Sequence, residues 1–333
     1  MYSLKNLLVV LFQAISVAAL AAPTPQLECH RNSLINYADY DLTVERLRQL
    51  FVTKRFLELE EALKCLHLGT QRFASGKSGD SAVYWVFRKQ MPAPGARATD
   101  LALADQWKKE IPHSIFAEFS ALRHQYAMAW NARGSGYANE VTGKAWQSFE
   151  QAISDVNQQA LKATNQLRDT AIFHNLLLAI AADGDSQHQT ADIFYSSVLK
   201  WPQYYDFYDV ALSRLVPRWG GSWELVDAFI SDWSAKLQGR ESDSMYARLY
   251  SGVVRYAESP QDTRLDWLKM KSSLEVLLRM YPDPKHTNVA ASFACAYGDL
   301  PYLKAKLQEL RQSEVRLSAW VRGTDPVSCA RLI

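Results

Sequence analysis

The side chains best suited to acid–base or metal chemistry are the seven histidines, and they are scattered along the chain. No HExxH pattern or comparable metal-ligand spacing occurs among them. His113 and His124 are close enough in sequence to share a helix face, but no carboxylate completes a set of ligands. The segment Gly76-Lys77-Ser78 resembles only the end of a phosphate-binding loop, and no GxSxG or GxGxxG is present. We therefore expect a protein with no catalytic activity and no metal or other cofactor.

The densest aromatic run extends from Trp201 to Tyr208. Aromatic rings with one polar end are frequent in carbohydrate and protein binding sites, and they are also common where helices pack. We expect packing to be the main role of the run. The alternative is a surface for a partner, with Tyr204, Tyr205 and Tyr208 as contact residues and part of the Tyr204 ring exposed.

Residues 217–222 read Pro-Arg-Trp-Gly-Gly-Ser, a composition typical of a joint between two helices. Proline disfavours a helix through the residue before it, glycine permits unusual backbone conformations, and serine caps a following helix. We expect a left-handed backbone at the second glycine. The predicted joint residues are Pro217, Gly220, Gly221 and Ser222.

The two remaining residues of this segment have large side chains that need neighbours. Trp219 is predicted to fill a gap between the two helices, and Arg218 to bind backbone carbonyls or an acid. In the alternative interpretation, Arg218 and Trp219 belong to the partner-binding surface with the three tyrosines.

Residues 217–222, with Tyr205, Tyr208 and Leu215 before them and Phe229 after them, resemble the signature of the bacterial domain-of-unknown-function family 4034. The likeness extends in general pattern over about residues 45–310. It implies a helical array of the tetratricopeptide type and brings no established activity with it.

The elements that would position these residues are helices. Apolar residues recur at steps of three and four in several segments, which places them on one helix face. The clearest stripe consists of Trp223, Val226, Ile230, Trp233 and Leu237. The best strand candidate, 82–87, does not alternate, and we interpret it as a buried helix.

Helix, short turn and helix recur along the chain, although no strict repeat motif is visible. The pattern predicts an all-α fold of stacked antiparallel helical hairpins, a degenerate tetratricopeptide-like α-solenoid. A compact, irregular all-α fold is the competing arrangement. We expect a signal peptide (1–21), an N-terminal helical pair (22–70), a loop-rich connector with one helix (71–99) and a main helical-repeat body (100–333).

The first residues have the pattern of a secretory signal. Lys5 precedes a short apolar run that ends in Ala19-Leu20-Ala21, and signal peptidases require small residues at such positions. We expect cleavage after Ala21 and release into the periplasm or the medium, the alternative being an uncleaved anchor. The run is shorter than the ~20 residues of a membrane-spanning helix.

Export would place the four cysteines where disulfides form. Four cysteines allow three pairings. We favour Cys29–Cys65 and Cys295–Cys329, because both pairs are local and each would tie one end of the chain to an adjoining helix.

Charge argues against a polyanionic partner. The chain has 37 basic and 35 acidic residues, and removal of residues 1–21 takes away one lysine and no acid, which leaves 36 − 35 = +1. We expect no nucleic acid and no membrane span after signal cleavage.

The sequence favours an exported interaction module that binds a protein or peptide partner, as an envelope adaptor or as an immunity protein that neutralises a toxin. The alternative is a cell-wall-associated protein, either a glycan-binding scaffold or a hydrolase.

Overall fold

The protein is represented by a computed structural model that describes residues 32–87, 96–134, 140–184, 187–237, 239–311 and 314–333. Within these ranges the regular elements are helices, and no strand is present. The prediction of an all-α fold is confirmed.

The first half of the chain builds one hydrophobic core. Its helices are α1 (Tyr40–Val52), α2 (Phe56–Leu68), α3 (Gly79–Val86), α4 (Ala96–Glu110), α5 (Ile115–Arg133), α6 (Gly143–Ala160), α7 (Asn165–Arg168) and α8 (Ala171–Asp183). Large aromatic side chains fill the centre of this core, where the Phe56 and Trp107 rings stack at 5.7 Å. Residues 71–87 are part of the same core, since α3 packs on α1, α2 and α8.

The second half builds another core. Its helices are α9 (Gln187–Lys200), α10 (Asp206–Leu215), α11 (Trp223–Lys236), α12 (Gly239–Val253), α13 (Trp267–Met280), α14 (Pro284–Ala296), α15 (Leu300–Glu309) and α16 (Pro326–Ala330). Most pairs of consecutive helices pack on each other, as α8 and α9 do across the short turn after Asp183. This arrangement is consistent with an array of helical hairpins.

Helix α8 is shared by the two cores. Ile172, Leu176 and Ile180 contribute to the first core, whereas Ala171 and Leu178 contribute to the second. A helix that is apolar around its whole circumference is stable only when it is covered on all sides. The sequence of α8 therefore makes it the common wall between the two halves of the array.

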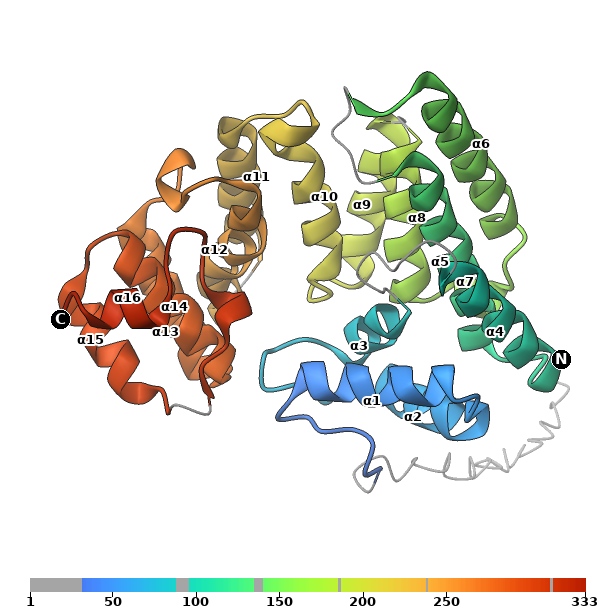
Figure 1. Cartoon of the computed structure of the whole chain (residues 1–333), viewed down its shortest axis with the longest axis horizontal. Coiled ribbons are helices and arrows are strands. Elements are labelled where there is room, and N and C mark those ends of the chain that lie inside the picture. The colour runs from blue at the N-terminus through green and yellow to red at the C-terminus, as the bar shows by residue number, and fades with distance from the viewer. Residues whose placement is uncertain (1–31, 88–95, 135–139, 185–186, 238, 312–313) are drawn as a thin grey trace, which may run out of the picture.

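The array bends so that its two ends approach each other. In Figure 1, α4–α9 lie on one side and α11–α16 on the other, with α10 between them and α1–α3, drawn in blue to cyan, below. Helices α1 to α3 thus lie near the C-terminal helices in space, although the two groups are far apart in the sequence.

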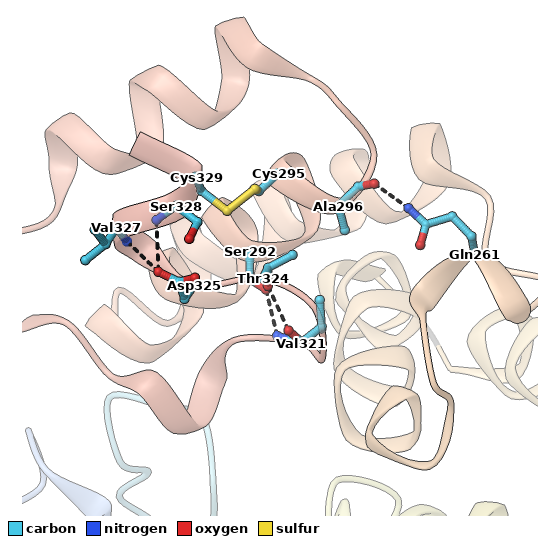
Figure 2. Close-up of a disulfide and its surroundings, with 10 residues drawn as sticks. All are labelled: Gln261, Ser292, Cys295, Ala296, Val321, Thr324, Asp325, Val327, Ser328 and Cys329. Carbon is cyan, nitrogen blue, oxygen red and sulfur yellow. Dashed lines mark hydrogen bonds between the residues drawn. A yellow bond between two sulfur atoms is a disulfide. The ribbon is translucent and has the colours of Figure 1, made fainter. Parts of the chain in front are cut away.

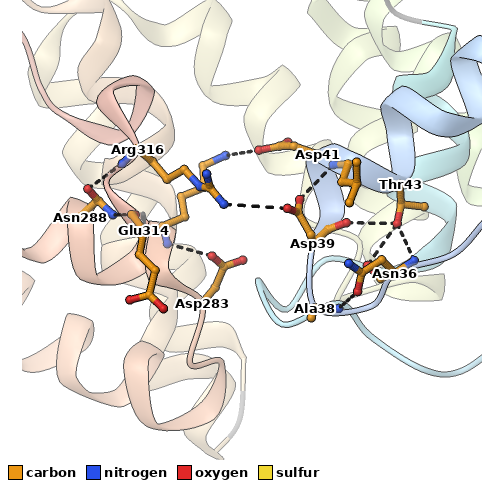
Figure 3. A network of polar contacts seen from close by, with 11 residues as sticks. Asn36, Ala38, Asp39, Asp41, Thr43, Asp283, Asn288, Glu314 and Arg316 are labelled. Carbon is orange, nitrogen blue, oxygen red and sulfur yellow. Dashed lines mark hydrogen bonds and ion pairs between the residues drawn. The ribbon is translucent and has the colours of Figure 1, made fainter. Parts of the chain in front are cut away.

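Charged side chains connect these distant segments, as Figure 3 shows. Arg316 Nη2 lies 3.9 Å from Asp39 Oδ2, and Lys285 Nζ lies 3.8 Å from Asp41 Oδ2. All four side chains are substantially exposed, so these long ion pairs add little stability.

The loop before α3 makes the closer contact. Arg248 Nη1 and His286 Nε2 both donate to the Ser75 carbonyl oxygen, at 3.2 and 3.1 Å. Gly76 has a positive φ of 79°, and a side chain there would collide with Arg248 and Tyr281. The glycine allows the loop to lie directly against α12 and α14.

A disulfide fixes the C-terminal end of the chain. Cys295 of α14 is bonded to Cys329 of α16 with the Cα atoms 5.8 Å apart, which confirms the predicted pair (Figure 2). Nearby, Ser292 Oγ accepts from the Val321 backbone N–H at 2.8 Å. The expected signal peptide, residues 1–21, lies outside the described residues. So does Cys29, one member of the expected pair Cys29–Cys65.

A search of the described residues for a helix with the length and apolarity needed to cross a membrane finds none.

Candidate functional site

A hollow of about 580 Å³ opens where α5, α6, α8 and α10 meet the segment after α10. Such a volume lies within the range of small-molecule and side-chain binding pockets. Four aromatic rings line it together with two guanidinium groups, and we call it the Trp–Arg pocket. The rings belong to Trp130, Trp146, Phe149 and Trp219, and the guanidinium groups to Arg133 and Arg214.

The Arg133 guanidinium lies among three indole rings. Its central carbon is 4.7 Å from the ring centroid of Trp146, 5.4 Å from that of Trp130 and 5.6 Å from that of Trp219. At such distances a cation is attracted to the face of an indole. Burial, and secondarily the charge of Arg218, lower the pKa of Arg133 below its usual value.

Asp183 organises the opposite wall of the pocket. Its Oδ2 accepts from Tyr126 Oη at 2.5 Å and from Trp130 Nε1 at 2.8 Å, and its Oδ1 is ion-paired with Arg214. A carboxylate on the last residue of a helix meets the negative end of the helix dipole. The two donors and the positive charge of Arg214 offset this unfavourable placement.

Trp219 reaches the pocket from the predicted joint. Its half-buried ring packs edge to face against the ring of Trp130, with the two ring centroids 6.2 Å apart. The central guanidinium carbons of Arg214 and Arg218 lie 5.6 and 5.7 Å from the Trp219 ring centroid. Trp219 thus lines a hollow rather than filling a closed core, and the exposed Arg218 lies beside it. Trp219 thus comes together with residues of α5, α6, α8 and α10, whereas Arg218 is not among the residues that line the pocket.

The joint that carries Trp219 is a single 3₁₀ turn, Pro217–Trp219, followed by two glycines. Gly220 has the left-handed conformation, with φ 88°. Gly221 does not, so the predicted left-handed backbone at Gly221 is wrong. Gly221 is needed for another reason, since a Cβ there would lie 2.0 Å from the Leu215 carbonyl oxygen.

Two further joint residues determine where the helices end and begin. The backbone of Val216, just before Pro217, is extended at φ −74° and ψ 152°, as a residue before proline prefers. Ser222 is the N-cap of α11, and its Oγ accepts from the Leu225 backbone N–H at 3.2 Å. The joint thereby fixes both the end of α10 and the start of α11.

The three candidate tyrosines lie elsewhere, in the second core. Tyr204, Tyr205 and Tyr208 are 4%, 8% and 0% exposed, so the expectation that part of the Tyr204 ring is exposed is wrong. Tyr208 donates to the Pro202 carbonyl oxygen at 3.1 Å, and Tyr205 donates to Glu241. Desolvation raises the pKa of all three phenols. These rings support α10 from inside and leave the surface to Arg218 and Trp219.

A buried serine, histidine and aspartate also lie close together. His124 Nδ1 donates to the Ser120 carbonyl oxygen at 2.8 Å, and its Nε2 is 3.6 Å from Asp100 Oδ2. A nitrogen that donates its proton there cannot accept one from the Ser120 hydroxyl. Because Ser120 is 0% exposed and His124 2%, this cluster lies out of reach of a substrate and stabilises the first core. No group of histidine, cysteine and acidic residues within the described ranges could hold a metal ion.

Sequence reasoning missed Trp130, Arg133, Trp146 and Asp183. Trp130 and Arg133 are three residues apart on one helix, a spacing that puts both on the same face. That spacing was the available signal, but it does not indicate which distant tryptophans complete the pocket.

Comparison with curated proteins and with solved structures returned no match. A family model, the domain of unknown function DUF4034, matches residues 43–188. The match includes the part of the pocket contributed by α5, α6 and α8, whereas residues 217–222 lie beyond it and are not tested as a signature of the family. Residues 43–188, which run from α1 to the first residues of α9, are thus similar to the domain of unknown function 4034.

Proposed function

We propose that this protein is an exported helical-repeat scaffold that binds a protein partner by holding one of its segments in the Trp–Arg pocket. The observation that carries the proposal is the convergence of Trp130, Trp146 and Trp219 from three separate parts of the chain on one open hollow. Large exposed aromatic surfaces are rare on monomeric proteins, and tryptophan and arginine are the residues that contribute most to protein-binding energy.

Export is the second part of the proposal. It is supported by the Lys5 to Ala21 pattern and by the Cys295–Cys329 disulfide, since such bonds persist in oxidising compartments. We propose no catalytic role. An adaptor of the envelope and an immunity protein would both use such a scaffold, and the identity of the partner distinguishes them.

The test starts with the protein purified from the envelope fraction together with the partner that accompanies it. The partner is then purified and its direct affinity measured for the parent protein and for Trp146→Ala. We expect a loss of at least 30-fold, roughly 2 kcal/mol, as for a central aromatic anchor. Trp223→Ala is the matched control, because Trp223 is also half-buried but lies outside the pocket.

Equal affinity of the parent protein and of Trp146→Ala for the partner would show that the partner does not bind in the Trp–Arg pocket. Sedimentation of the parent protein with purified peptidoglycan, lost in Trp146→Ala, would favour the cell-wall alternative instead.

A further inference from the structure

We infer that His286 makes the contact between the two ends of the array sensitive to acid, so that its protonation moves the loop before α3 away from α12 and α14. On one side of this contact are Ser75 and Gly76, and on the other are Arg248, Tyr281 and His286. We call these five residues the end contact. The inference is independent of the proposed function, because none of the five lines the Trp–Arg pocket.

A single backbone oxygen connects the two sides of the end contact. In the described part of the chain, both hydrogen bonds between this loop and helices α12 and α14 end at the Ser75 carbonyl oxygen, with Arg248 Nη1 at 3.2 Å and His286 Nε2 at 3.1 Å. A carbonyl oxygen only accepts, so Nε2 carries the proton of the neutral imidazole and Nδ1 takes up the second one. Protonation therefore keeps the donor to Ser75 and adds a positive charge to the imidazole.

The charges that act on His286 are all positive. They come from three elements packed around it, and they belong to Arg248 of α12, Lys285 of α14 and Lys77 of the loop before α3. The Lys77 ammonium lies 4.5 Å from the ring centroid of Tyr40, so it stays on the inner side of the loop. A second positive charge on His286 would be repelled from both sides of the contact.

The acids of this region have partners other than His286. Asp39 and Asp41 of α1 form the long ion pairs with Arg316 and Lys285. Asp283 Oδ1, before α14, accepts from the Lys285 backbone N–H at 2.8 Å. Glu241 of α12 accepts from Tyr281 Oη at 2.8 Å. Among the described residues no carboxylate pairs with His286, so a protonated imidazole has no countercharge there.

The end contact has little other polar support. The two ion pairs made by Asp39 and Asp41 are 3.9 and 3.8 Å long and largely exposed, and such pairs contribute little. Gly76 lies against Arg248 and Tyr281 only because it has no side chain. An electrostatic penalty at His286 therefore shifts the balance towards the separated arrangement without unfolding of the helices.

The electrostatics of His286 agree with this geometry. Burial, and then the charge of Arg248, outweigh the hydrogen bond to Ser75 and lower the pKa of His286 to about 3 in the closed arrangement. Separation returns the imidazole to water, where its pKa is near the ordinary value of ~6.5. The separated form thus binds the proton more tightly, and acid favours it. We expect the ratio of separated to closed molecules to rise by about tenfold or more between pH 7 and pH 5.

The test traps the separated form with a thiol at the contact. Ser75 is 6% exposed, and its Oγ has no hydrogen-bond partner among the described residues, so Ser75→Cys is a conservative change. The rate of reaction with a dipyridyl disulfide, a reagent that remains active in acid, measures how often the contact separates. Dividing by the rate for Ser231→Cys, at an exposed serine on α11, removes the effect of pH on the reagent and on the thiol.

A variant that cannot titrate assigns the effect to His286. The normalised rate for Ser75→Cys should rise by about tenfold or more from pH 7 to pH 5. In Ser75→Cys combined with His286→Gln it should not change, because glutamine can still donate to the carbonyl oxygen but takes up no proton. Equal rates at the two pH values in the presence of His286, or the same rise without it, would overturn the inference.

A second measurement needs no substitution at the contact. Titration of the His286 imidazole in the parent protein by NMR should give a pKa well below the ordinary value. A pKa at or above that value would also overturn the inference, since protonation would then not oppose the closed arrangement. Neither result affects the proposed function, which is tested separately through the affinity of Trp146→Ala for the partner.

Discussion

Arg214 of α10 is ion-paired with Asp183, the last residue of α8, and the pair connects two walls of the Trp–Arg pocket. The Asp183 side chain is 1% exposed and that of Arg214 27% exposed, so the carboxylate is shielded from water. Burial lowers the pKa of Arg214, yet its guanidinium is the only positive charge with a described ion pair to this carboxylate.

We predict that Arg214→Gln destabilises the protein by about 3 kcal/mol, because it leaves a buried carboxylate without a countercharge. Urea denaturation followed by circular dichroism measures the change. Lys236→Gln is the control, since it removes an exposed i,i+4 pair with Asp232 and should leave the midpoint nearly unchanged. Equal midpoints for Arg214→Gln and the parent protein would show that the pair contributes no net stability.

The position of Trp219 predicts a separation between stability and binding. Trp219→Ala should cost only about 1–2 kcal/mol of stability, since half-buried rings lose less packing than core rings. Trp107→Ala, which empties a site that is 0% exposed, should cost about 3–5 kcal/mol. Thermal melts of both variants, together with the affinity for the partner, check this. If Trp219→Ala lost as much stability as Trp107→Ala, the Trp219 ring would fill a closed gap between the helices, as the sequence predicts.

The two glycines of the joint should respond differently to substitution. Gly221→Ala places a Cβ against the Leu215 carbonyl, so the backbone must shift and we expect a loss of about 2 kcal/mol or more. At Gly220 a side chain would meet open space, and only the left-handed backbone opposes it. Gly220→Asn should therefore be tolerated better than Gly220→Ala. Denaturant titration of the three variants ranks them by loss of stability. A smaller loss for Gly221→Ala than for Gly220→Ala would contradict the packing argument.

His286 predicts a loss of stability on acidification. Burial, and then the charge of Arg248, lower the pKa of His286 to about 3 in the folded protein. The unfolded chain binds a proton near pH 6.5 while the folded protein does not, so the contribution of neutral His286 falls as the pH decreases from 6.5 towards 3. We expect a loss of about 1–2 kcal/mol between pH 6.5 and 5.

The comparison with His286→Gln isolates the effect of His286 protonation on the free energy of unfolding. Glutamine can still donate to the Ser75 carbonyl oxygen but does not titrate. Denaturation midpoints at pH 7, 6 and 5 should therefore fall less steeply for the variant than for the parent protein. Parallel curves would show that His286 takes up its proton equally well in the folded state.

The disulfide gives a further prediction. In the chain-entropy description, a bond across 34 residues stabilises the fold by about 3–4 kcal/mol. Cys329→Ser should lower the melting temperature in oxidising buffer, and a reducing agent should lower the melting temperature of the parent protein by more than that of the variant. Unchanged melting of the reduced parent protein would show that α14 and α16 hold together without the bond.

Local sequence patterns were sufficient for features that depend on near neighbours. The apolar stripe from Trp223 to Trp233 lies on α11, and Ser222 is the N-cap of that helix. Both could be predicted because periodicity and capping depend on residues a few positions apart. The joint at 217–222 could be located for the same reason. Cys295–Cys329 could be chosen because both residues lie near one end of the chain.

Features that depend on distant neighbours were not accessible in this way. Arg133 and Asp183 share a pocket because α5, α6 and α8 fold together, and no local period determines that pairing. The reason for a glycine at 221 is the approach of the Leu215 carbonyl, which only the bend of the chain creates. Tyr204 resembles a surface aromatic in the sequence, yet the second core closes over it.

The shared position of α8 has a consequence for how the molecule responds as a whole. Melting of either half would expose one side of a helix that is apolar on every side, so neither half has a low-cost way to unfold alone. Because Asp183 at the end of α8 also forms a wall of the pocket, a ligand bound there adds its free energy to the same cooperative unit. Occupancy of a site made largely by the first half of the chain would thus slow hydrogen exchange in the second half, as far as the helices around Cys295.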